Sequence, residues 1–182
     1  MTPTGARGGT VRRAGQIDRS RRRAGSAPVA REREGDVAEF SMTPQEREAF
    51  LADVHVGVLA IEEPGRGPLA LPVWYVYRDG EVRIDIDGSS LKARLLAAAG
   101  RATLTVQNEA PPYQYVSVEG PVILDAPRDH LEMAVRYLGP EVGRWYTDRN
   151  PRGESAIVVR LVPERWRTKD YEKLFSGGTD AS

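Results

Sequence analysis

The amino-acid sequence predicts a mainly β protein with packed helices, arranged as a six-stranded antiparallel barrel. Short apolar or alternating runs, separated by turns and loops, indicate the strands. The order helix-β-β-β-helix-β-β-helix-β suits an antiparallel sheet that closes on itself, with helices packed on its outside. The strands are expected at 55–61, 69–77, 81–86, 102–108, 113–125 and 154–166, and the helices at 43–53, 89–99 and 125–138, with a short helical piece at 140–148.

Local signals support the individual elements. Thr43 with Glu46 three residues later forms a capping box, and Pro44 suits the first helical position. The RDG tripeptide after the second strand is typical of a tight hairpin turn. Pro72 has no N–H to donate, so the second strand should lie at a sheet edge or be interrupted there. Gly120, followed by proline, predicts a bulge or bend in the fifth strand.

The helix predicted at 89–99 carries an unusual lysine in its first turn. Ser89 or Ser90 can cap this helix, and Gly100 can end it. Its apolar face is expected to contain Leu91, Leu95 and Ala98. The helix dipole disfavours Lys92 at that position by about 0.3–1 kcal/mol. Either a bound anion such as phosphate compensates the lysine there, or the lysine is simply solvated.

Composition places limits on the class of protein. The chain has 182 residues with 26 basic and 26 acidic side chains, enough for one domain with a core. Residues 1–40 hold nine arginines and five acidic residues, so the remaining chain has a small acidic excess and gives no reason to expect a nucleic-acid substrate. The absence of cysteine excludes disulfides and thiolate sites and suits a reducing cytoplasm, and no apolar run reaches membrane length.

The chain divides into a start rich in arginine, one domain and a short end. Residues 1–41 lack periodic apolar positions and the apolar centre of a secretory signal, so we expect them to be disordered. A transit peptide, a nucleic-acid-binding arm and a translation start at Met42 are the alternatives for this segment. We expect the folded domain at 42–175 and a disordered tail at 176–182.

Several common chemistries have little support in the sequence. His55 and His130 lie in different predicted elements without a neighbouring metal-ligand pattern, so we expect no metal site. The sequence contains no G-x-S-x-G, Walker A or G-x-G-x-x-G motif. Asp85 and Asp87 share one face of a strand, either as solvated charges or beside a bound cofactor.

Three segments together favour a cofactor that combines a ring with a phosphate. The second strand contains the aromatic pair Trp74 and Tyr75, which point to opposite faces, so one of them should belong to the core. The segment SSLK at 89–92 supplies a candidate phosphate site. Apolar ring surfaces supply affinity, and a few amide groups orient the polar edge of the ring. The candidate polar and aromatic residues around the fifth strand are Gln107, Asn108, Tyr113, Gln114 and Tyr115.

The ordered segments PVWYVY, DGEVRIDI, SSLKARLL, ATLTVQ and PPYQYVSVEGPV resemble the pyridoxamine-5'-phosphate oxidase-like, FMN-binding split-barrel superfamily. The resemblance covers residues 43–171 and is greatest to bacterial oxidoreductases that use FMN or the deazaflavin coenzyme F-420. It implies a flavin-reductase-like split β-barrel and a homodimer with its sites at the subunit interface.

The resemblance also implies roles for individual residues. Ser90 and Lys92 would bind the cofactor phosphate, helped by Ser89 and Arg94, because Leu91 stands where relatives often have a basic residue. The backbone of Pro72, Val73 and Trp74 would border the flavin ring, and Gln114 and Tyr115 would reach its polar edge. Trp145, Trp166 and Lys169 would complete the site of the neighbouring subunit.

The implied function is that of an oxidoreductase. It would transfer a hydride between reduced F-420 or FMN and a small unsaturated organic substrate. The segment VPERWRTKDYEKLF lacks the Arg-x-His element of true pyridoxamine phosphate oxidases, which disfavours that reaction. No side chain is an obvious acid or base, although Tyr75, Tyr113 and Tyr115 are candidate proton donors. The alternative is a non-catalytic carrier of flavin or heme. The expected position of both histidines outside the phosphate site is an argument against heme.

Overall fold

A computed structural model describes residues 40–126, 130–151 and 153–176. Most of the expected disordered segments, 1–41 and 176–182, therefore lie outside the described residues. Phe40 and Ser41 are described, and both contact the domain: the Phe40 carbonyl accepts a hydrogen bond from the Asp170 N–H at 2.8 Å, and the Ser41 carbonyl accepts one from Lys173 Nζ at 2.8 Å.

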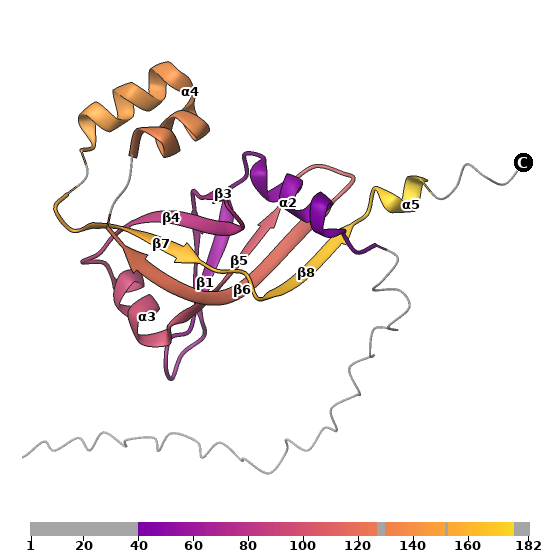
Figure 1. Ribbon diagram of the computed structural model, residues 1–182, viewed down its shortest axis with the longest axis horizontal. Coiled ribbons are helices and arrows are strands. Elements are labelled where there is room, and N and C mark those ends of the chain that lie inside the picture. Colours follow the sequence, from indigo (N-terminus) through magenta and orange to yellow (C-terminus); the bar gives the residue numbers. More distant parts are fainter. Residues whose placement is uncertain (1–39, 127–129, 152, 177–182) are drawn as a thin grey trace, which may run out of the picture. The chain divides into compact units, whose positions relative to one another are not determined.

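The described residues form an antiparallel sheet of eight strands that curls around one core, which confirms the predicted fold class (Figure 1). Its hydrogen-bonded order is β2-β1-β5-β6-β7-β4-β3, and β8 also pairs with β6. The strands are β1 (Gly57–Ile61), β2 (Leu69–Val73), β3 (Val76–Arg78), β4 (Glu81–Asp87), β5 (Arg101–Gln107), β6 (Gln114–Asp125), β7 (Ala156–Leu161) and β8 (Arg165–Asp170).

Strand β6 connects the two halves of the sheet. Its first part pairs with β5 on one side and β8 on the other, whereas from Val122 onward it pairs with β7 (Figure 1). The change of partner falls next to Gly120, where the sequence predicts a bend. A Cβ on Gly120 would lie 1.8 Å from the Val162 carbonyl oxygen, so this crossing requires glycine.

The sheet contains two more strands than predicted, because two of the predicted strands are each divided. The second predicted strand is interrupted at Trp74 and Tyr75, which gives β2 and β3. The last one ends at Leu161, and after a corner containing Pro163 the chain continues as β8. Strand β2 is an edge strand, as Pro72 predicts.

Helices α2 (Pro44–Ala52) and α3 (Leu91–Ala99) begin and end as predicted. The capping box of Thr43 and Glu46 is present, Ser90 caps α3, and Gly100 ends it with φ of 63°. Of the predicted apolar face of α3, only Leu95 packs against the core, where it is partly buried. Leu91 is 47% exposed and Ala98 is exposed, whereas the buried residues of α3 are Ala93 and Leu96. Contacts with β1 and β5 decide which side of α3 is buried. The spacing of apolar residues in the helix does not show where those strands lie.

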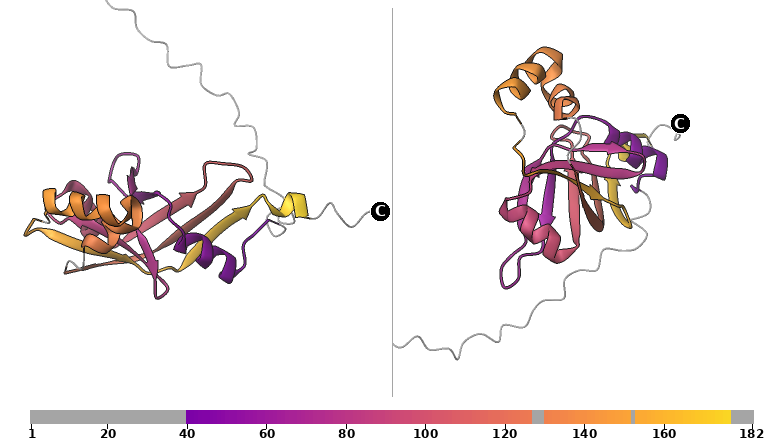
Figure 2. Two further views of the ribbon diagram at one scale, coloured as in Figure 1. Left: turned by 90° about the horizontal axis from the view of Figure 1, so that it is seen from above. Right: turned by 60° about the vertical axis from the view of Figure 1, so that its left-hand side comes forward.

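Helix α4 (His130–Arg149) consists of two helical segments that meet at Gly139, whose φ is 80° (Figure 2). This matches the predicted helix and shorter helical piece, except that residues up to Asp125 belong to β6 and 127–129 lie outside the described residues. Gly143 packs on the backbone of Val135, so the two segments contact each other. A short helix, α5 (Lys173–Ser176), follows β8.

The core lies inside the curled sheet and is closed by α2 and α3. Fully buried side chains come from the strands β1, β4, β5, β6 and β7, from Tyr75 and from both helices. No helix among the described residues is long and apolar enough to span a membrane. The largest fully buried side chains include Leu51, Leu59, Ile61, Tyr75, Ile84, Leu96, Leu104 and Leu161.

Candidate functional site

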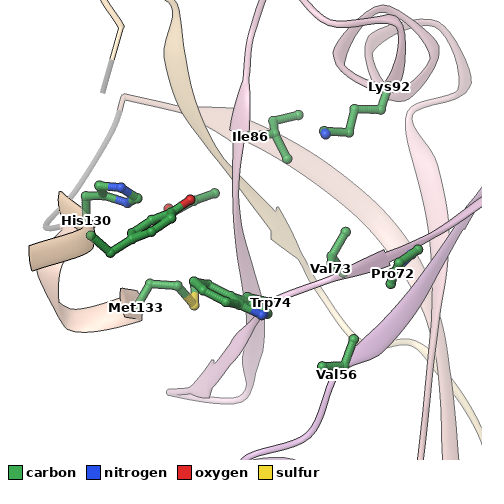
Figure 3. A pocket seen from close by; sticks show the side chains of 10 residues that line it. Val56, Pro72, Val73, Trp74, Ile86, Lys92, His130 and Met133 are labelled. Carbon is green, nitrogen blue, oxygen red and sulfur yellow. The ribbon is translucent and has the colours of Figure 1, made fainter. Parts of the chain in front are cut away.

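A cleft of about 390 Å³ lies where the end of β2, the strand β4, the start of α3 and both segments of α4 meet. Figure 3 shows Lys92 extending from α3 toward Ile86, while His130 and Met133 approach from α4 on the other side. A second cavity of about 360 Å³ adjoins the cleft and shares Asp85, Ile86, Lys92 and His130 with it. The cleft is lined by Val56, Pro72, Val73, Trp74, Asp85, Ile86, Lys92, His130, Met133 and Tyr146.

One wall of the cleft is the interruption between β2 and β3. The Tyr75 N–H, which has no strand partner there, donates to the Tyr137 hydroxyl oxygen of α4 at 2.9 Å. The same hydroxyl lies 2.7 Å from the His55 carbonyl oxygen and 3.0 Å from that of Tyr75. The Trp74 ring stacks on the Tyr137 ring with a centroid distance of 4.9 Å and an angle of 4°. Helix α4 therefore holds Trp74 against the cleft.

The opposite wall is the first turn of α3. The Ser90 hydroxyl accepts from the Ala93 N–H at 3.3 Å and donates to the Asp87 carbonyl at 2.5 Å. The Ser89 N–H and hydroxyl both donate to the Asp87 carboxylate at 2.9 Å, and Ser155 donates to it at 2.6 Å. These hydrogen bonds, that of Ser155 first, hold the pKa of Asp87 below its ordinary value. Both serines are thus engaged within the turn, and Lys92 presents its side chain to the cleft.

Charged and aromatic groups of the cleft lie on different sides. Lys92 supplies a positive charge. Asp85 supplies a carboxylate to the cleft, to the adjoining cavity and to a third cavity of about 230 Å³. On α4, the Tyr146 ring lies 6.0 Å from His130 and 5.9 Å from Trp74, tilted by 55° to each. The cleft thus combines a cation at a helix start with a wall of flat rings.

The cleft brings together four of the eight predicted cofactor-binding residues. Pro72, Val73, Trp74 and Lys92 all line it. Ser89 and Ser90 belong to the turn before α3, and the Ser89 carbonyl also accepts a hydrogen bond from Arg94 at 3.2 Å. Gln114 and Tyr115 lie elsewhere, in a separate cavity of about 380 Å³. The other residues of that cavity are Gln107, Asn108, Glu109 and Tyr113.

The candidate proton donors lie outside the main cleft. Tyr75 is fully buried in the core, where burial raises the pKa of its hydroxyl. It is therefore the core member of the pair with Trp74. Tyr113 and Tyr115 line the separate cavity with Gln114. Proton donation by any of the three stays a prediction.

The three residues expected to complete a neighbouring subunit's site are spread over the domain. Trp145 is 53% exposed on α4, with the Arg149 guanidinium 4.6 Å from its ring centroid. Trp166 packs against the core, with the guanidinium of Arg47 4.1 Å from its ring centroid. Lys169 Nζ lies 5.6 Å from the centroid of the Phe40 ring.

Helix α4 contributes residues to the cleft that its sequence does not predict. His130 was expected to lie away from the phosphate site, but it lines the same cleft as Lys92. Met133, Tyr137 and Tyr146 were not predicted at all. The spacing of His130 and Met133 on one helical turn was the available signal, but it does not show where the helix docks. Among the described residues, no group of three or more His, Cys, Asp or Glu side chains could hold a metal.

Solved structures share this fold, although no protein-family model and no curated protein matches the chain. A conserved hypothetical protein of Mycobacterium tuberculosis is 25% identical over 80% of this chain and 94% of its own, with a TM-score of 0.64. The chain shares the fold of this protein, a split β-barrel as the sequence predicts. A FAD-binding protein of Mesorhizobium loti shares this split barrel at 20% identity, with a TM-score of 0.53 over 71% of this chain and 96% of its own. The FAD and heme binding protein of Mycobacterium smegmatis shares it at 16% identity, with a TM-score of 0.55 over 77% of this chain and 80% of its own.

Proposed function

We propose that this split barrel is an oxidoreductase that binds coenzyme F-420 or FMN in the cleft and transfers a hydride to or from a small unsaturated organic substrate. One observation carries the proposal: a single cavity joins Lys92, at the start of a helix, to the interrupted strand at Pro72–Trp74. The superfamily resemblance predicts a phosphate at the first of these places and a flavin ring at the second.

The start of α3 fits a phosphate through its lysine and its backbone. The N–H groups of Leu91 and Lys92 lie in the first turn, where no preceding helical carbonyl can accept from them. A phosphate there gains these donors, the positive end of the helix dipole and the Lys92 charge. The hydroxyl of Ser89 already serves Asp87, so the serine supports the turn that aims Lys92.

The interrupted strand fits a flat ring. Val73 and Trp74 line the cleft at the end of an edge strand, where the backbone lacks a partner strand beyond β1. Apolar contacts from Val56, Ile86 and Met133 cover the same space, which excludes water from a bound ring.

The chain's own contribution is to bind, orient and shield. Lys92 fixes the phosphate end, and Val73 with Trp74 orients the ring. When bound, the reduced cofactor supplies the hydride, and the protein supplies the apolar surroundings in which a substrate meets it. His130 and Tyr146 are the polar groups of α4 that face the cleft beside Asp85.

We also propose a homodimer formed through the outer face of β1 and β2. Val58 on β1 is 45% exposed, and Val54 and Val56, in the segment before β1, are 53% and 51% exposed. Across the sheet, Val58 is in register with Pro72 on β2 and with Thr105 on β5, so an uncharged strip leads from the cleft toward β6. In such a dimer, Gln114 and Tyr115 of one subunit would lie beside the cleft of its partner.

The Lys92→Ala variant tests the phosphate site. Titration with FMN and F-420, followed by tryptophan quenching, should show binding weakened by about 1.5–3 kcal/mol, which is typical of a charged hydrogen bond. Arg66→Ala is the matched control, because Arg66 is an exposed cation in the loop between β1 and β2 and does not line the cleft. Equal affinity in the Lys92 variant and the native chain would contradict the assignment.

A heme carrier is the second candidate function, and the position of His130 favours it. His130 and Met133 both face the cleft from one turn of α4, and either the imidazole or the thioether could hold a heme iron there. Hemin added to the ligand-free protein would then produce a Soret band that is lost in His130→Ala. Flavin binding without a hemin-dependent band would exclude this function.

A further inference from the structure

We propose that Tyr137 is a positioning residue for the cofactor site: its hydroxyl takes the place of the missing strand at the β2–β3 interruption and thereby fixes Trp74. The inference rests on the proposed function for the role of Trp74, but the contacts that carry it do not depend on a ligand.

The interruption leaves backbone groups of the edge segment without sheet partners. Tyr75 lies between β2 and β3, is fully buried, and so needs a partner for its N–H and carbonyl. Tyr137 provides it, accepting from the Tyr75 N–H at 2.9 Å. The single phenolic proton is shared between the His55 carbonyl at 2.7 Å and the Tyr75 carbonyl at 3.0 Å. One hydroxyl thus joins three backbone groups from two strand ends.

The same side chain sets the angle of Trp74. The two rings are nearly parallel, 4° apart, with centroids separated by 4.9 Å. Trp74 lines the cleft, so the orientation of its ring depends on where Tyr137 stands. The neighbouring Arg136 secures the helix by donating to the carbonyls of Ala52 and Asp53 at 2.5 and 2.7 Å. The position of α4 on the sheet therefore determines the shape of the wall that would bind the ring.

Substitution of Tyr137 by phenylalanine separates the hydroxyl from the ring. Phenylalanine keeps the stack on Trp74 but leaves the Tyr75 N–H and two carbonyls without this partner. We expect Trp74 to become more mobile and more accessible. In a full chain whose other tryptophans are replaced (Trp145→Phe and Trp166→Phe), acrylamide quenching of Trp74 should rise at least about twofold in Tyr137→Phe, before any ligand is added.

Flavin affinity gives a second readout that a merely structural role would not produce. Riboflavin and FMN share the ring but only FMN has the phosphate. Tyr137→Phe should weaken both by the same factor, at least about fivefold, because only the ring wall changes. Lys92→Ala should weaken FMN and leave riboflavin unchanged. The ratio of the two dissociation constants therefore distinguishes the ring wall from the phosphate site.

Two controls separate positioning from loss of stability. Ile61→Val removes a buried methyl group from β1, away from the cleft residues, and should lower the melting temperature without changing Trp74 quenching. Tyr171→Phe removes a hydroxyl near the C-terminal end and should change neither quantity. If Tyr137→Phe folds and leaves Trp74 quenching unchanged, or if Ile61→Val raises quenching equally, the inference is wrong. If the native chain binds neither FMN nor F-420, the proposed function fails, and the quenching comparison alone decides the role of Tyr137.

Discussion

His55 is a histidine that folding places in a position unfavourable to its charged form. Its ring stacks on Phe50 with a centroid distance of 4.5 Å, and its Nε2 atom is buried without a hydrogen-bond partner among the described residues. Desolvation lowers the pKa of His55, the nearby Arg136 cation lowers it further, and Asp53 opposes both. The folded protein therefore favours neutral His55.

This environment predicts a pH-dependent stability. The unfolded chain binds the proton near the ordinary histidine pKa of about 6.5, whereas the folded chain binds it only at lower pH. The free energy of unfolding should therefore fall as the pH drops below about 6.5 and through the lowered pKa of His55. Urea unfolding between pH 7.5 and 5 measures this slope. His55→Phe keeps the stack on Phe50 and removes the titration, so its slope should be smaller; an identical slope would show that His55 is not the cause.

Strand β6 shows how a single small residue permits a change of strand partners. Gly120 lies where β6 leaves β8 for β7, and an added Cβ would collide with the Val162 carbonyl oxygen at 1.8 Å. Gly120→Ala should destabilise the fold by roughly 3 kcal/mol or more, because backbone atoms must move to make room. The shift of the urea midpoint measures it. Gly67→Ala is the control, since nothing lies within 4 Å of its added Cβ, and an equal loss there would contradict the argument.

The elements that the sequence predicts well are those whose signals are local. The capping box at Thr43 and the glycine end of α3 depend on residues within a few positions of each other, and both are present. An interruption of the second strand is one of the two alternatives that Pro72 predicts, but its position at Trp74 and Tyr75 is not predictable locally, because the hydroxyl that stabilises it comes from α4, 62 residues later. Strand β8 was missed because its sequence, RWRTKD, is mostly polar.

The difference between local and distant signals also explains which residues of the candidate site the sequence predicts. Pro72 and Lys92 were found because a proline in a strand and a lysine in the first turn of a helix are locally unusual. The α4 residues of the cleft carry no such signal, since His130, Met133 and Tyr146 are ordinary residues of an amphipathic helix. Gln114 and Tyr115 lie in a separate cavity of the same chain, so their predicted role requires a second subunit.

The proposed homodimer makes a prediction for the whole molecule. A charge placed on Val58, in the middle of the uncharged strip on β1 and β2, would be buried without a partner if that strip is the subunit interface. Val58→Glu should therefore give a monomer in sedimentation and light scattering, while circular dichroism shows an intact fold because Val58 already faces outward. Flavin affinity should fall with dimer loss, since the Gln114 cavity of the partner is removed from the cleft.

The control for this prediction is Ile123→Glu, on the part of β6 that pairs with β7. Ile123 is 42% exposed, close to the 45% of Val58, so the two substitutions place the same charge on similarly exposed apolar side chains. Ile123→Glu should leave the mass unchanged. If both variants stay dimeric, the β1–β2 face is not the interface, and if the native chain is itself a monomer that binds flavin, the cleft of one subunit is sufficient. If only Val58→Glu becomes a monomer and its flavin affinity falls, the outer face of β1 and β2 is the subunit interface and the partner subunit contributes to the binding site. Gln114 and Tyr115 line a separate cavity of their own chain, so they would reach the cleft of the partner and not their own.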